Sequence, residues 1–542
     1  MLDECPAWSL KLTPVSLDSE QRFTALSYVW GDPADKPSVV IDGYSVKVTK
    51  NLHSALSRLR RQGFTGHIWI DALCINQCDT LEKNSQVPLM ARIYSQAENV
   101  LIWLGPEPDG GALRAIQQLG IHFREQVRNQ PNDGGERIEA FVKTVRDYAI
   151  TGTTRLQTGF DFEAIWRFFR QRAWWRRVWV IQEVVLAQHA TVLCTENPQV
   201  SATWDDTITW TTFGNGSENA IQATDPRDRI YGLLGLVRLG DRQKILVDYS
   251  PNTTLDTVLS SVARALLEEH GPDVLSFCQG TDLSPDGRPS WVPDWTLHRV
   301  PGIGEVSLTS DTKQQYNASN GATWTEWASR SRIRGALCGD PVACLPGIII
   351  GRAVEVGREF TALPFTPSFL NDCREWLGEL KDIVARSLGH KGKDAAQQAM
   401  TLRNLWRIPI ADVGLIRRPT AEDTVVFEEQ YEILTGRHPP PADLDGEAAD
   451  AWVIAQTWEY RRPWKIYQRR AFADDNGCPG LGPKTMEPGD CVVLLAGAHV
   501  PFIIRRDSNG GSRYRLVGPA YVQGSMDGEK SEKSLFIDIE LI

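Results

Sequence analysis

One acidic side chain, Glu183, lies among aromatic and basic residues in the segment RRVWVIQE (176–183). On a helix, Trp179 would lie one turn before it and Arg176 about two turns before it. A carboxylate beside an indole and a guanidinium could line a site for a nucleotide sugar. The simpler alternative is an ion pair between Glu183 and a neighbouring arginine, Arg176 or Arg177, since ion pairs also perturb buried carboxylates.

The position of Glu183 depends on a helix that we expect over residues 175–187. Val178, Ile181 and Val185 would form its buried stripe. Glu183 would point away from that stripe, because its position on the helix differs from theirs. The helix is therefore expected to hold the carboxylate outside the apolar stripe.

Candidate binding residues also stand at the end of an apolar strand expected over residues 23–29. They are hydroxyl-bearing, aromatic or glycine, and comprise Ser27, Tyr28, Trp30 and Gly31. Trp30 could stack on a base, with packing in the core as an equal competitor. The following Gly-Asp-Pro sequence marks a loop.

Asp71 follows a second, brief apolar strand at residues 68–70. An acidic residue at this place can bind ribose hydroxyls, as it does in dinucleotide sites. A helix cap or a partner for an arginine is the competing interpretation. Cys74 lies nearby, but no local histidine is present to make it a nucleophile.

Short apolar strands alternate with helical patterns, and this arrangement must position the candidate residues. A third strand is expected at 100–104, and helices are expected around 52–59, with Asn51 as a cap, and around 87–97. Continuous apolar strands of this kind indicate a mostly parallel sheet covered on both faces. Ligands of such sheets bind beyond the carboxyl ends of the strands, where the candidate residues stand.

The rest of the chain has a different character. We expect an α/β domain over residues 1–195, with an insertion near 105–160. A mainly helical region is expected over 196–460, and a small β-rich region over 461–542.

Composition excludes several classes of function. The 58 Lys+Arg against 68 Asp+Glu give a net charge of −10, which disfavours binding to nucleic acid. No secretory signal and no apolar run of membrane-spanning length is visible, so we expect no membrane partner. The ten cysteines form no CxxC pairs, and the nine histidines show no zinc-ligand spacing with them. These features predict a cytoplasmic protein without a bound metal.

Three sequence blocks, in this order, resemble the fungal heterokaryon-incompatibility (HET) domain. They are LSYVWGD (26–32), WIDALCINQ (69–77) and RAWWRRVWVIQEVVLA (172–187). Downstream, DPRDRIYGLLGL (225–236), VDYS (247–250) and SWVPDW (290–295) also look like stand-alone members of that family. Cys78 departs from the pattern, since an acidic or polar residue is more usual after Gln77.

The resemblance implies a fold and an activity. The HET domain is remotely similar to the TIR domain, a flavodoxin-like module, and some TIR domains cleave NAD with one glutamate. That glutamate lies in a block similar to S-x-W-C-x-x-E-L, so R-V-W-V-I-Q-E-V assigns the catalytic role to Glu183 by resemblance. NAD or a related nucleotide would then be a substrate, with no permanently bound cofactor. The residues expected to contact it are Ser27, Tyr28, Trp30, Gly31, Asp71, Arg176 and Trp179.

Three functions follow as alternatives. In the first, NAD hydrolysis triggers regulated cell death during fungal non-self recognition. In the second, the domain is a noncatalytic signalling module that acts by self-association or by binding a HET-type partner. In the third, the scaffold serves as an enzyme of specialised metabolism with a repurposed pocket.

Overall fold

A computed structural model describes most of the chain in two compact units, Met1–Leu255 and Asp256–Ile542. The described residues are 9–32, 34, 36–106, 171–193, 222–237, 239–278, 288–295, 303, 316–321, 324–334, 342–362, 368–390, 395–414, 418–461, 464–508 and 512–542. The insertion predicted near 105–160 lies outside them, apart from its first two residues. The domain boundaries predicted after residues 195 and 460 stay predictions.

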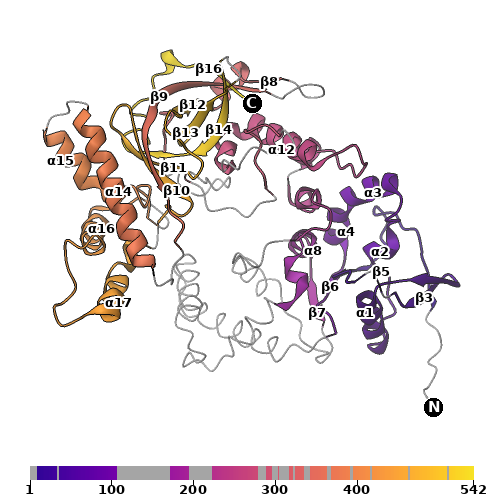
Figure 1. Ribbon diagram of the computed structural model, residues 1–542. Helices are drawn as coiled ribbons and strands as arrows, with labels where there is room; N and C mark the ends of the chain where they lie inside the picture. The colour runs from indigo at the N-terminus through magenta and orange to yellow at the C-terminus, as the bar shows by residue number, and fades with distance from the viewer. Residues whose placement is uncertain are drawn as a thin grey trace. The chain divides into compact units, whose positions relative to one another are not determined.

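The first unit contains a parallel four-stranded sheet (Figure 1). Its strands are β2 (Thr24–Tyr28), β5 (Ile68–Trp69), β6 (Asn99–Trp103) and β7 (Ala190–Leu193), in the spatial order β5-β2-β6-β7. Every pairing in it is parallel, which confirms the predicted parallel sheet. The chain adds strands on one side of β2 and then on the other, so the order reverses between β2 and β6. Doubly wound sheets bind ligands at such a point.

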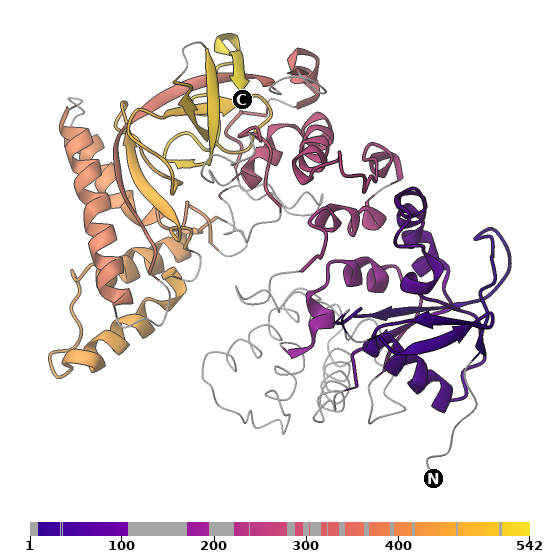
Figure 2. The same ribbon diagram turned by 45° about the vertical axis from the view of Figure 1, so that its right-hand side comes forward.

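Helices cover both faces of this sheet. They are α1 (Lys50–Arg61), α2 (Asp71–Cys74), α3 (Thr80–Gln86), η1 (Val87–Leu89), α4 (Met90–Gln96), η2 (Ala173–Arg176) and α8 (Trp179–Val185). Figure 2 shows α1 on one side of the strands and α4 with α8 on the other. A smaller sheet of β1 (Ser9–Leu10), β3 (Ser38–Ile41) and β4 (Tyr44–Lys47) accompanies them, and α10 (Asp228–Tyr231), η3 (Leu234–Leu236) and α11 (Leu239–Arg242) follow.

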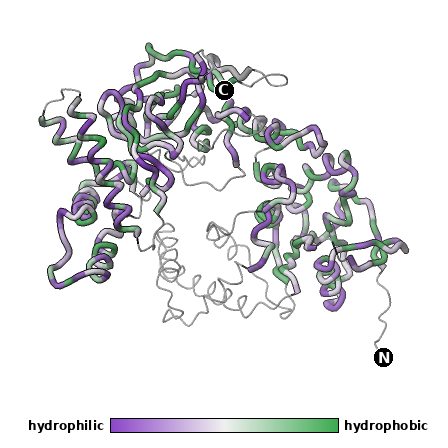
Figure 3. The backbone as a smooth tube through the Cα atoms, viewed as in Figure 1, coloured by the Kyte–Doolittle hydropathy of each residue, from purple (hydrophilic) through white to green (hydrophobic). Residues whose placement is uncertain are grey.

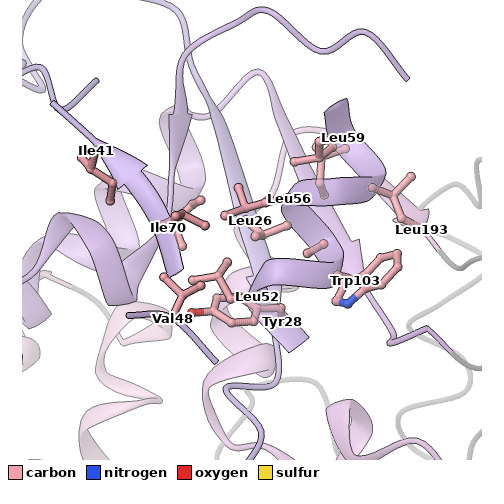
Figure 4. Close-up of a cluster of buried hydrophobic side chains, with 13 residues drawn as sticks. Leu26, Tyr28, Ile41, Val48, Leu52, Leu56, Leu59, Ile70, Trp103 and Leu193 are labelled. Atoms are coloured by element: carbon pink, nitrogen blue, oxygen red, sulfur yellow. The ribbon is translucent and has the colours of Figure 1, made fainter. Parts of the chain in front are cut away.

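Helix α1 shows how the sequence builds the core of this unit. Leu52, Leu56 and Leu59 are buried against Leu26 and Trp103 of the sheet (Figure 4). This spacing is that of one helical face, as predicted. The N-cap is Thr49, whose hydroxyl accepts from the Leu52 amide, so the predicted cap at Asn51 is wrong. Asn51 lies inside the helix, and its side chain hydrogen-bonds residues at the ends of β2 and β6.

The second unit begins with helical segments and continues into helices and sheet. The helical elements are α12 (Leu255–His270), η4 (Gly271–Phe277), α13 (Trp324–Trp327), η5 (Ala328–Arg330), α14 (Phe369–His390), α15 (Ala395–Arg403), η6 (Asn404–Arg407), α16 (Ala421–Leu434), α17 (Gly446–Gln456), α18 (Trp458–Arg461) and η7 (Lys533–Leu535). The strands are β8 (Arg332–Arg334), β9 (Val342–Glu359), β10 (Arg469–Asp474), β11 (Pro479–Pro483), β12 (Cys491–Leu495), β13 (Phe502–Arg506), β14 (Arg513–Pro519), β15 (Tyr521–Val522) and β16 (Ile537–Leu541).

The strands described in this unit form one nine-stranded sheet centred on β9. The long β9 pairs with β8, β10, β12 and β16, all antiparallel. Helix α14 packs on β9 and β10, and hydrophilic and hydrophobic stretches alternate along it in Figure 3. The β-rich C-terminal region is thus confirmed, although β9 comes from the stretch predicted to be mainly helical. Within the described residues, no helix is both long enough and apolar enough to cross a membrane.

Candidate functional site

The carboxyl end of β2 brings buried polar groups together at the point where the strand order reverses. Ser27 is 1% exposed and points to the face covered by α8, and Glu183 on α8 is also 1% exposed. The Ser27 hydroxyl donates a hydrogen bond to Glu183 Oε2. The indole Nε1 of buried Trp174 donates to Ser27 Oγ over 2.8 Å. Trp174 therefore fixes the serine, and the serine fixes the carboxylate.

A second carboxylate, Asp71, is anchored on the other side of the same strand end. The indole Nε1 of Trp30 donates to Asp71 Oδ2 at 2.8 Å, and the Ala72 amide donates to Oδ1 at 2.7 Å. The Tyr28 hydroxyl also hydrogen-bonds the Asp71 side chain. Asp71 is the first residue of α2, so it ties the start of that helix to two aromatic residues at the end of the first strand.

Arg177 joins the two carboxylates electrostatically. It is half-buried, and its guanidinium donates to the carbonyl oxygen of Tyr28. Its positive charge acts to lower the pKa of Glu183 and of Asp71. One cation thus serves two buried acids.

Burial outweighs this attraction. Desolvation raises the pKa of Glu183 to about 7, against the lowering effects of Arg177 and of the Ser27 hydrogen bond, and Asp71 raises it further. Burial also raises the pKa of Asp71. Burial and the nearby Asp71 keep the Tyr28 hydroxyl protonated by raising its pKa well above the usual range. The site therefore holds one carboxyl that changes its charge near neutral pH.

The structure brings most of the predicted site residues together. Ser27, Tyr28, Trp30, Asp71 and Glu183 are linked in the contacts above. Gly31 follows them with a φ of 81°, a left-handed conformation that glycine adopts without strain, and it turns the chain away from the strand. These predicted residues thus do lie together at the end of β2, while their role in binding a ligand stays a prediction.

The prediction for the face of α8 is wrong. Helix α8 begins at Trp179, after a 3-10 turn over residues 173–176, and not near 175. Val185 is 46% exposed and Ile181 is only partly buried, whereas Glu183 lies on the buried side. Both α4 and η3 pack against α8. Because two elements cover this helix, its buried surface is not the single apolar stripe that was predicted.

Trp179 belongs to a neighbouring polar cluster. Its indole hydrogen-bonds Asp228, which also accepts from the Tyr249 hydroxyl over 2.6 Å. The Lys83 ammonium lies 3.6 Å from the centre of the Tyr249 ring. Trp179 therefore ties α8 to the later segments of the unit. Arg176 is partly buried, and its backbone carbonyl accepts a hydrogen bond from the Gln222 amide.

Three residues of the site were not predicted as such. Trp174 and Arg177 are described above, and the sequence predicts Arg177 only as an ion-pair partner of Glu183. Asn51 donates from Nδ2 to the Val29 carbonyl over 2.6 Å and accepts from Trp103 Nε1 over 2.8 Å. It thereby joins the ends of β2 and β6 from α1. The available signal was a polar residue directly before the helix predicted over residues 52–59.

Comparisons with known proteins agree on one family. Residues 23–183 match the family model "Heterokaryon incompatibility protein (HET)", and residues 450–541 match the "Het-6 beta-barrel domain". The chain is 24% identical to "Heterokaryon incompatibility protein 6, OR allele" of Neurospora crassa, over 96% of this chain and 91% of that protein. No solved structure matches the chain.

Proposed function

Since this chain is a heterokaryon-incompatibility (HET) domain protein, we propose that it hydrolyses the nicotinamide–ribose bond of NAD at the end of β2 and so triggers regulated cell death in fungal non-self recognition. The observation that carries this proposal is the buried Glu183 carboxyl at the strand-order reversal, with its pKa raised to about 7. The TIR-like relationship of the fold is part of the proposal, and it rests on the parallel strand order β5-β2-β6-β7.

The chemistry suits a single carboxylate. Loss of nicotinamide leaves an oxocarbenium-like ribose, and a nearby carboxylate stabilises that positive charge, as in glycoside hydrolysis. Nicotinamide departs as a neutral molecule from a cationic ring, so the reaction needs no general acid. Glu183 would act in its ionised form, which the Arg177 charge favours.

The neighbouring residues would bind the substrate. Asp71 would accept hydrogen bonds from ribose hydroxyls, and Trp30, which is 39% exposed, would offer its ring for stacking. Glu183 itself is 1% exposed in this structure. Turnover therefore requires a state in which the Ser27 hydrogen bond gives way to substrate.

That burial supports a second candidate, a noncatalytic signalling module. Both carboxylates receive hydrogen bonds from protein groups, and these bonds tie β2, α2 and α8 to one another. A network of this kind serves stability without any ligand. The domain would then act by self-association or by contact with another HET-type protein.

The decisive experiment measures nicotinamide release from NAD by the full chain, free and under forced clustering. Glu183→Gln keeps the hydrogen bond with Ser27 but removes the charge, and we expect at least about a hundredfold loss, in line with other charge-stabilising groups. Glu98→Gln is the matched control, because Glu98 is an exposed partner of Arg22 in the same unit.

The outcomes separate the two candidates. Full activity in Glu183→Gln would show that Glu183 is not the catalytic residue. No release by the wild type, even when clustered, would reject hydrolysis. Toxicity in fungal cells that survives Glu183→Gln would then favour the noncatalytic module.

A further inference from the structure

A cysteine and a lysine meet in the second unit, far along the chain from the proposed NAD site. Cys478 ends the turn between β10 and β11, and Lys530 lies in the loop that follows β15. The Lys530 ammonium donates to Cys478 Sγ over 3.2 Å. Cys478 is a reduced, partly exposed cysteine, and the Lys530 side chain is 26% exposed. Small reagents can therefore reach both groups.

A buried carboxylate holds this pair in place. Asp474 is 0% exposed, and its Oδ1 accepts from the Asn476 amide at 2.9 Å and from the Cys478 amide at 2.7 Å. Its Oδ2 is buried without a hydrogen bond and lies 3.8 Å from Lys530 Nζ. The same aspartate thus orients the backbone of the cysteine and attracts the lysine charge.

The chemistry of the three groups is that of a reactive thiol. A lysine ammonium beside a cysteine stabilises the thiolate, which is the nucleophilic and oxidisable form. Accessible thiolates are the cysteines that peroxides oxidise to sulfenic acid, and a sulfenic acid can condense with a nearby nitrogen. Here the nearby nitrogen is the lysine amine.

We propose that Cys478 and Lys530 form a peroxide-responsive site that closes into a covalent sulfur–nitrogen link. Hydrogen peroxide transfers one oxygen to the Cys478 thiolate, and the hydroxide that leaves takes a proton from the Lys530 ammonium, which gives sulfenic acid, water and a neutral amine. The deprotonated Lys530 amine then attacks the sulfur, the S–O bond breaks, and a second water leaves with the hydroxyl and an amine proton. The thiol and amine together lose two protons and two electrons, and these reduce the peroxide to water.

The link would join two segments of the C-terminal sheet region. The β10–β11 turn would be bonded to the loop around residue 530, and an added thiol reductant would reverse the bond by attack on sulfur. This site does not depend on NAD hydrolysis, since it lies in the other unit and uses none of the residues around Glu183.

The test uses the full chain, hydrogen peroxide and mass spectrometry of the digested protein. We expect a linked peptide pair, containing Cys478 and Lys530, that is two hydrogens lighter than its separate parts and is released by dithiothreitol. Lys530→Arg keeps the positive charge but removes the amine, so it should lose the link while a 1,3-dione still traps sulfenic acid at Cys478. Lys530→Gln removes the charge too, and trapping should fall about tenfold, because the thiolate loses the ammonium that stabilises it.

Two controls test whether the link is specific to Cys478. Cys478→Ser must abolish the link, and exposed Cys78 of the first unit reports ordinary thiol reactivity in the same sample. The proposal fails if the wild type yields no linked pair, if the pair is heavier by one oxygen, or if Lys530→Gln is trapped as fast as the wild type. Circular dichroism of each variant shows that the fold is kept.

Discussion

At the scale of single residues, Glu183 sets a pH dependence of stability. Its pKa in the folded chain is raised from 4.5 to about 7, chiefly by burial. The folded state therefore holds a proton that the unfolded state loses, and the resulting cost grows from about pH 4.5 and is complete above about pH 7. A shift of this size corresponds to about 3 kcal/mol.

Glu183→Gln should consequently stabilise the first unit more at alkaline than at acidic pH. We expect its advantage over the wild type to grow by about 2 to 3 kcal/mol between about pH 5 and about pH 8. Denaturant unfolding of both chains at the two pH values measures the difference. An advantage that does not change with pH would mean that Glu183 is not the buried, partly protonated group described here.

The residues of this site differ in how well the sequence predicts them. Ser27, Tyr28 and Asp71 could be placed because parallel strands end at one edge of a sheet, and apolar runs reveal the strands. The roles of Asn51 and Arg177 could not be predicted. Each side chain belongs to another part of the chain and donates to a backbone carbonyl at the end of β2. Such pairings depend on packing between elements and leave no local pattern.

At the scale of elements, α8 is held by close approach of its neighbours. Gly235 of η3 leaves no room for a side chain, since a Cβ there would lie 2.8 Å from Ala91 Cβ and closer still to Gln182 Oε1. Gln182 is adjacent to Glu183 and is 1% exposed. The spacing of apolar residues in α8 could not predict that Gln182 is buried, because η3, which covers it, comes from a distant segment of the sequence.

Gly235→Ala should therefore push η3 away from α4 and α8. We expect a loss of about 1 to 3 kcal/mol in the stability of the first unit, the usual cost of overpacking. Gly240→Ala is the matched control, because nothing lies within 4 Å of a Cβ at that helical position. It should be neutral or slightly stabilising, since alanine favours helix over glycine. Equal effects of the two changes, measured by denaturant unfolding, would contradict the close approach.

At the scale of the whole molecule, the first compact unit extends to Leu255, beyond the boundary predicted after residue 195. The later segment is bound to the earlier one by specific contacts. The Val178 amide donates to the Gln222 carbonyl over 3.1 Å, and Asn84 of α3 hydrogen-bonds both Asp248 and the Tyr249 amide. Residues 222–255 therefore complete the packing around α3 and α8.

A chain of residues 1–255 should fold alone, whereas a chain of residues 1–195 should not. The shorter chain loses η3 and the partners of Asn84 and Trp179, so apolar and polar groups that are buried in the unit become exposed. Cooperative thermal unfolding, followed by tryptophan fluorescence, compares the two. Asn84→Ala in residues 1–255 should lower stability by about 1 to 3 kcal/mol, because it leaves the backbone amide of buried Tyr249 without its hydrogen-bond acceptor. If residues 1–195 unfold as cooperatively and at the same temperature as residues 1–255, the downstream segment is not part of the folding unit, and the boundary predicted from the sequence is the better one.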